Sequence, residues 1–72
     1  MPLVQVKLIE EALSTEEKER LIAGITDATT AVVGHDVRQF VWVLLDEVSS
    51  GSWGMGGRPI TTEAVRQMRG VA

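Results

Sequence analysis

Residues 14–34, with the sequence STEEKERLIAGITDATTAVVG, decide the fold of this chain. Apolar side chains recur in this segment at the three- and four-residue spacing of a helix with one buried face. Ser14 stands three residues before Glu17, which is the pattern of a capping box at a helix N-terminus. Gly34 is suited to end the helix. The segment therefore predicts a helix over residues 15–33.

A strand-like run lies on each side of this helix. Residues 3–9 (LVQVKLI) form a strand with one face made of Val4, Val6 and Leu8. Residues 40–45 (FVWVLL) are apolar on both faces, which predicts a second strand buried on both sides, and we expect Asp46 and Glu47 to end it. A helix of about 20 residues between two strands favours a parallel β-α-β unit with a right-handed crossover. Since one helix covers one face of a two-stranded sheet, we expect the other face to meet another subunit.

The rest of the chain begins with a glycine-rich segment. Residues 51–57 (GSWGMGG) contain four glycines, which predicts a small turn or hairpin. No Lys-Ser/Thr pair follows them, which argues against a phosphate-binding loop. We expect Thr61 or Thr62 to cap a short helix that runs to about Met68 and stops at Gly70.

Length and composition bound the class of protein. The chain has 72 residues, 44% of them hydrophobic, with no cysteine and a net charge of −3. We expect one small domain over residues 1–72, and a homo-oligomer, because the apolar content exceeds what one small core can bury. The negative, interspersed charge argues against a nucleic-acid partner, and no apolar run approaches the roughly 20 residues that cross a bilayer. A cytoplasmic protein without nucleic-acid or membrane partners is expected.

The second residue offers the most unusual chemistry of the chain. Removal of Met1 would expose Pro2 as a secondary amine, and an α-amino group ordinarily has a pKa of about 7.7–8.0. Modest desolvation or a neighbouring cation lowers that pKa toward neutrality. A neutral amine accepts a proton from carbon most efficiently when its pKa is near the working pH. Pro2 is therefore the candidate catalytic base, and retention of Met1 would turn its nitrogen into an amide and abolish this chemistry.

Together these pieces resemble the 4-oxalocrotonate tautomerase family, whose members are short chains with a catalytic amino-terminal proline. The likeness covers roughly residues 2–59. It rests on Pro2 with the strand that follows, the helix start at Ser14, the run WVLLDE and the segment GSWGMGG.

The resemblance implies an α+β (α/β) fold, in which a β-α-β subunit with a short C-terminal hairpin and helix pairs into four-stranded dimers. It implies a hexamer built as a trimer of dimers, with a dimer as the alternative. It also implies a keto-enol tautomerase, an isomerase of unsaturated 2-oxo (2-hydroxy-dienoic) acids, with Pro2 as general base. The expected partner is thus a small enol or oxo acid, and no cofactor or metal is expected.

The chain departs from the family where arginines are usual. The family has one between the first strand and the helix, where this chain reads EEAL at residues 10–13, and another on the second strand, where this chain has Trp42. Arg38 is a candidate substitute, because it shares strand parity with Trp42 if the strand extends that far. Trp53 stands where the best-known members have phenylalanine, and we expect it to keep the site dry and help lower the amine's pKa. The expected substrate-binding residues are Arg38, Trp42 and Trp53.

Two other functions stay open. Related proline enzymes hydrate, dehalogenate or decarboxylate acrylate-type acids, and these reactions need a protonated proline and a carboxylate or similar group to activate water. No such carboxylate is obvious in this sequence, and Glu11 is the residue left open for the role. The missing arginines would also suit a non-catalytic oligomer that binds a small apolar ligand.

Overall fold

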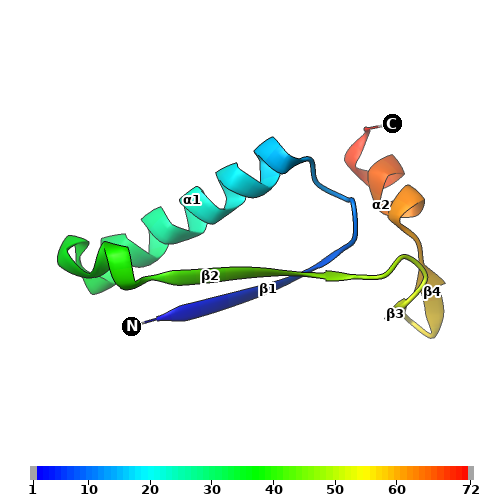
Figure 1. Ribbon diagram of the computed structural model, residues 1–72. Helices are drawn as coiled ribbons and strands as arrows, with labels where there is room; N and C mark the ends of the chain where they lie inside the picture. The colour runs from blue at the N-terminus through cyan, green and yellow to red at the C-terminus, as the bar shows by residue number, and fades with distance from the viewer. Residues whose placement is uncertain (1, 72) are drawn as a thin grey trace.

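The computed structural model describes residues 2–71, so Met1, whose removal the catalytic hypothesis requires, lies outside the described residues, as does Ala72. The elements follow in the order β1 (Leu3–Ile9), α1 (Thr15–Val33), the 3₁₀-helix η1 (His35–Phe40), β2 (Trp42–Val48), β3 (Trp53–Met55), β4 (Arg58–Ile60) and α2 (Thr62–Arg69). Figure 1 shows a long β1-β2 ribbon under α1, with the β3-β4 hairpin and α2 at the end away from the N-terminus.

The two long strands form the β-α-β unit that the sequence predicts. β1 pairs with β2 in parallel, in a register that runs from Leu3 opposite Trp42 to Ile9 opposite Val48. The crossover between them is α1, which lies over one face of the ribbon (Figure 1). The expected parallel pairing is confirmed.

The α1 helix begins and ends where its local signals place it. Ser14 Oγ accepts a hydrogen bond from the Glu17 N–H, and the Glu17 carboxylate accepts one from the Ser14 N–H, which completes the capping box. At the other end Gly34 has a φ of 113°, a conformation that favours glycine, and its N–H donates to the Thr30 carbonyl. The predicted bounds of this helix, residues 15–33, are confirmed.

The predicted bounds of the second strand are wrong. Phe40 closes η1, the strand starts at Trp42, and it continues through Asp46 and Glu47 to Val48. The reason is pairing, because β1 has seven residues and each of them has a partner in β2.

Each carboxylate within β2 has its own lysine partner. The Lys7 ammonium lies 3.2 Å from the Asp46 carboxylate on the open face of the ribbon, and Lys18 of α1 pairs with Glu47 on the covered face. Because successive strand residues point to opposite faces, the two adjacent acids do not form a carboxylate pair.

The two faces of the ribbon differ in burial. Val4, Val6, Val43 and Leu45 lie half-buried under α1. On the open face Leu3, Trp42 and Leu44 are 53%, 63% and 41% exposed. Burial of the second strand on both faces is therefore not achieved within one chain, and this face carries the apolar surface for which we expect a second subunit.

The C-terminal part matches the expected hairpin and helix. β3 and β4 pair antiparallel across a turn at Gly56 and Gly57, whose φ values are 62° and 81°. Thr61 is the N-cap of α2, since its Oγ1 accepts from the Ala64 N–H, and Gly70 ends the helix in the left-handed conformation. Between residues 2 and 71, no helix is both long and apolar enough to cross a membrane.

Candidate active site

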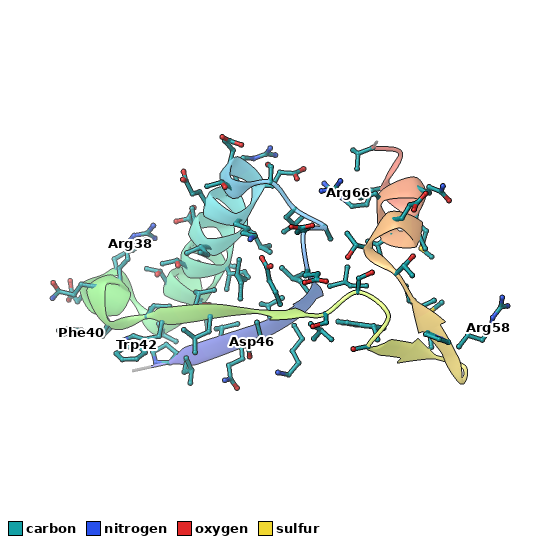
Figure 2. The ribbon with its side chains drawn as sticks, turned by 45° about the vertical axis from the view of Figure 1, so that its right-hand side comes forward. Arg38, Phe40, Trp42, Asp46, Arg58 and Arg66 are labelled. Carbon is teal, nitrogen blue, oxygen red and sulfur yellow. The ribbon has the colours of Figure 1, made fainter. Side chains whose placement is uncertain are left out.

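Pro2 and Trp42 lie together at one end of the ribbon. Pro2 is half-buried just before β1, and its carbonyl accepts a hydrogen bond of 3.0 Å from the Trp42 N–H at the start of β2. The Trp42 side chain lies on the open face of the ribbon, beside Phe40 in Figure 2. The structure thus brings two of the predicted site residues together, next to an exposed apolar surface.

Arg38 is not placed as the strand-parity argument expected. It belongs to η1, four residues before β2 begins, so the condition that the strand extends to Arg38 is not met. Its Nη1 donates to the Asp27 carboxylate of α1 at 2.7 Å. Figure 2 shows Arg38 on the α1 side of η1, away from Trp42. The expectation that both side chains share one face is wrong, because the 3₁₀-helix turns the backbone before the strand starts.

Trp53 lies in an apolar hollow at the other end of the ribbon. The hollow has a volume of about 290 Å³ and is lined mainly by apolar side chains of β1, the residues after it, the hairpin and α2. Those that matter here are Ile9, Leu13, Trp53, Met55, Val65 and Met68. We call this cavity the Trp53 hollow. Trp53 is half-buried there, and its role as a wall of the substrate pocket stays a prediction.

One chain does not unite Pro2 with the Trp53 hollow. The seven residues of β1, at about 3.3 Å per residue, put roughly 20 Å between its two ends. Figure 1 shows the N-terminus and the hairpin at opposite ends of the ribbon. A site that contains both Pro2 and Trp53 must therefore be completed by a second chain.

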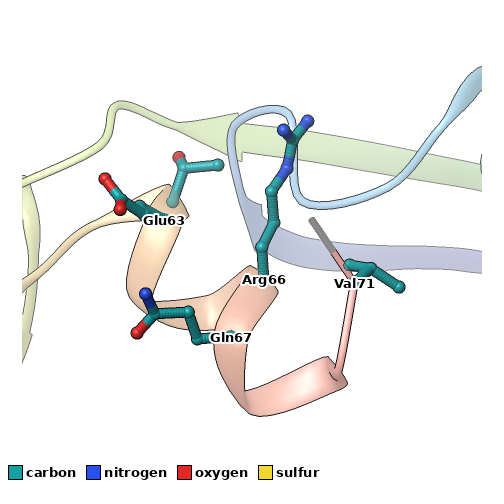
Figure 3. Close-up of a pocket in the computed structure, with 5 residues that line it drawn as sticks. Glu63, Arg66, Gln67 and Val71 are labelled. Carbon is teal, nitrogen blue, oxygen red and sulfur yellow. The ribbon is translucent and has the colours of Figure 1, made fainter.

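Two arginines that the sequence analysis missed reach the connector, residues 10–13, from α2. Arg66 donates from Nε and Nη2 to the Glu11 carbonyl, at 3.0 and 2.7 Å. Arg69 donates to the Ala12 carbonyl and pairs with the Glu17 carboxylate. Figure 3 shows Arg66 pointing from α2 toward this connector. The available signal was their three-residue spacing, which places both guanidinium groups on one side of the predicted helix.

The charges at this end are set by these contacts. The hydrogen bond from Arg69, together with the backbone hydrogen bond from Ser14, lowers the pKa of Glu17 to about 2. At the β2 edge the hydrogen bond from Lys18 lowers the pKa of Glu47. Both acids are therefore ionised at neutral pH. Among residues 2–71, no group of three or more His, Cys, Asp or Glu side chains is arranged to hold a metal ion.

A family model described as "Tautomerase enzyme" matches residues 2–63, which is most of the chain and includes both Pro2 and Trp53. This chain belongs to the tautomerase family. The family expected from the sequence is confirmed, and because tautomerases are isomerases, so is the expected enzyme class.

Similar proteins agree with this assignment. A probable tautomerase of Dickeya dadantii is 34% identical over 61 residues, which are 85% of this tautomerase and 90% of that protein. A structure from work on the 4-oxalocrotonate tautomerase isozymes of Methylibium petroleiphilum has 31% identity and a TM-score of 0.72, covering 89% of this chain and 97% of that one. TomN, a 4-oxalocrotonate tautomerase homologue in the tomaymycin biosynthetic pathway, has 30% identity and a TM-score of 0.75, covering 93% and 95%. The expected β-α-β fold with a C-terminal hairpin and helix is thereby confirmed.

Proposed function

We propose that this tautomerase interconverts the enol and keto forms of unsaturated 2-oxo acids, with the free amine of Pro2 as the base that moves the proton. The observation that supports this most directly is the position of Pro2, half-buried at the edge of an exposed apolar surface and hydrogen-bonded through its own carbonyl to β2. Such surroundings desolvate an amine once the surface is covered, and desolvation lowers its pKa toward neutrality.

The site is completed by neighbouring copies of the chain. Leu3, Trp42 and Leu44 leave a wide apolar face open, and a second copy is the partner that suits it. In this proposal two chains pair into a four-stranded dimer, and three dimers assemble into a hexamer. Such an assembly would bring Pro2 of one chain to the Trp53 hollow of another. A dimer alone is the simpler alternative.

The proposed reaction needs three functions from the site. The amine of Pro2 removes a proton from the enol oxygen or from carbon and returns it to another carbon of the conjugated system. A donor or cation must face the oxygen on which negative charge develops. Apolar walls around the amine and the developing negative charge, including Trp53, exclude water and strengthen the electrostatic interactions of both groups.

Titration of the amine tests this proposal. Intact mass first establishes that Met1 is absent, and ¹⁵N-labelled proline then reports the pKa of the Pro2 nitrogen by NMR. We expect a pKa below the ordinary range of about 7.7–8.0, and measurable conversion of phenylenolpyruvate or 2-hydroxymuconate.

A matched control carries a Gly-Ser extension before Pro2, which blocks the amine and leaves every side chain in place. We expect this variant to fold and assemble normally but to lose the activity. A trimmed protein that converts neither enol would contradict the proposal, and so would full activity in the extended variant.

A further inference from the structure

The wall of the Trp53 hollow includes residues beyond the part of the chain that matches the family. The match ends at residue 63, whereas Val65, Met68 and Arg69 of α2 line the same hollow as Trp53. The helix is held there by its own contacts, since Thr62 Oγ1 donates to the Glu10 carbonyl at 2.7 Å and Arg66 donates twice to the Glu11 carbonyl. The α2 helix, which lies beyond the residues matched by the family model, therefore shapes part of the cavity.

The charged residues that line the hollow are both cationic. Lys7 and Arg69 are among its lining residues, and none of those residues is acidic. Their acidic partners, Asp46 and Glu17, do not line it. A lysine ammonium has three N–H donors and an arginine guanidinium five. Within residues 2–71, Arg69 donates hydrogen bonds from Nη1 and Nη2, and its own Nε donates none. Each cation thus has N–H donors beyond those that these hydrogen bonds use.

We propose that the Trp53 hollow is the substrate subsite, in which Arg69, assisted by Lys7, binds the carboxylate, and Trp53, Val65 and Met68 surround an aromatic or branched apolar tail. The inference rests on the proposed function, because the 2-oxo acid is taken to be the substrate of the Pro2 amine. It assigns the substrate class as 2-oxo monocarboxylic acids with such a tail, in preference to dicarboxylic acids.

Size and desolvation support this class. The volume of about 290 Å³ lies just below the roughly 300–1,000 Å³ typical of ligand cavities, which suits a small acid. A second carboxylate at the far end of the substrate would face the apolar side chains of Met55, Val65 and Met68. These apolar side chains offer no hydrogen-bond donor to a carboxylate, whereas an apolar tail packs against them, so a diacid binds less well than an acid with an apolar tail.

The test compares Arg69→Gln with Arg66→Gln. Both changes remove a guanidinium that binds the connector from α2, but only Arg69 lines the hollow. We expect Arg69→Gln to raise the KM for phenylenolpyruvate about tenfold or more, because a charged hydrogen bond is lost, with kcat little changed. Arg69→Lys keeps the charge and should recover much of the affinity. Arg66→Gln weakens the attachment of α2 but removes no N–H donor from the hollow, so it should raise KM clearly less than Arg69→Gln does.

A second variant tests the tail. Val65→Phe fills part of the hollow, and we expect it to raise the KM for phenylenolpyruvate while leaving that for the enol of 2-oxobutanoate nearly unchanged. An equal effect on both substrates, or an unchanged KM in Arg69→Gln, would overturn the inference. So would a wild-type preference for 2-hydroxymuconate over phenylenolpyruvate in kcat/KM.

Ligand binding separates this inference from the proposed function. Phenylacetate, an inert carboxylate with an aromatic body, should quench Trp53 fluorescence saturably in a Trp42→Phe background, and more weakly when Arg69→Gln is added. Saturable quenching in a protein that converts no enol would refute the proton-transfer function alone. Conversion of enols without any Arg69-dependent binding would refute the subsite alone.

Discussion

A mixed-oligomer experiment tests whether Pro2 and Trp53 act together across chains. One chain carries the Gly-Ser extension that blocks Pro2, and the other carries Trp53→Ala, which removes the aromatic wall of the hollow. We expect an oligomer made only of the blocked chain to be inactive. An oligomer made only of the Trp53→Ala chain should lose at least about tenfold in kcat/KM, which corresponds to about 1.4 kcal/mol of transition-state stabilisation. The two chains are then produced together under separate affinity tags, so that oligomers containing both can be purified.

The expected recovery follows from the separation within one chain. Because roughly 20 Å lies between the two ends of β1, a site that contains both Pro2 and Trp53 must take them from different chains. In an equal, random mixture a site is intact only if the Trp53→Ala chain supplies Pro2 and the blocked chain supplies Trp53. Each condition holds with a probability of one half, so about a quarter of the sites should be fully active.

Steady-state assays with phenylenolpyruvate measure this recovery, and mass spectrometry of the intact oligomers measures how the chains mix. If both residues of a site came from the same chain, mixing would restore nothing above the average of the two parents. Mixed oligomers that show no recovery would therefore refute the reasoning from the fold.

Two further predictions concern stability, measured at fixed protein concentration. Thr30 is 1% exposed and its Oγ1 has no hydrogen-bond partner among residues 2–71, so Thr30→Val should raise the free energy of unfolding, measured in urea, by about 1–3 kcal/mol. The control Thr26→Val removes a hydroxyl that donates to the Ile22 carbonyl and should give no gain in stability. A loss of stability in Thr30→Val would contradict the argument. Glu17→Gln keeps the capping box but loses the negative charge that Arg69 binds. The pKa of Glu17 falls from 4.5 to about 2 on folding. The ionised Glu17 carboxylate therefore stabilises the fold above pH 4.5, and this stabilisation is lost as the pH falls toward 2. Wild type should accordingly have the higher Tm at pH 6 and match the variant near pH 2, and a difference that stays constant over this range would contradict the linkage.

Local signals in the sequence determined most of the elements. The capping box and apolar spacing of residues 14–34 predicted α1 to the residue, and alternation predicted β1 over residues 3–9. The glycines of residues 51–57 predicted the hairpin, and a threonine cap with Gly70 predicted α2. These predictions succeed because caps, turns and short-range periodicity depend on residues only a few positions apart.

Only the tertiary structure decided which of these residues meet. The bounds of β2 depend on its pairing with β1, and Arg38 turns to Asp27 because a 3₁₀-helix intervenes before the strand. Arg69 reaches the Ala12 carbonyl from 57 positions away, a contact that no local pattern encodes. Long-range contacts arise when whole elements pack, since that packing sets which side chains share a cavity. The sequence named Pro2 and Trp53 as site residues. The length of β1 in the structure decided that one chain holds them apart.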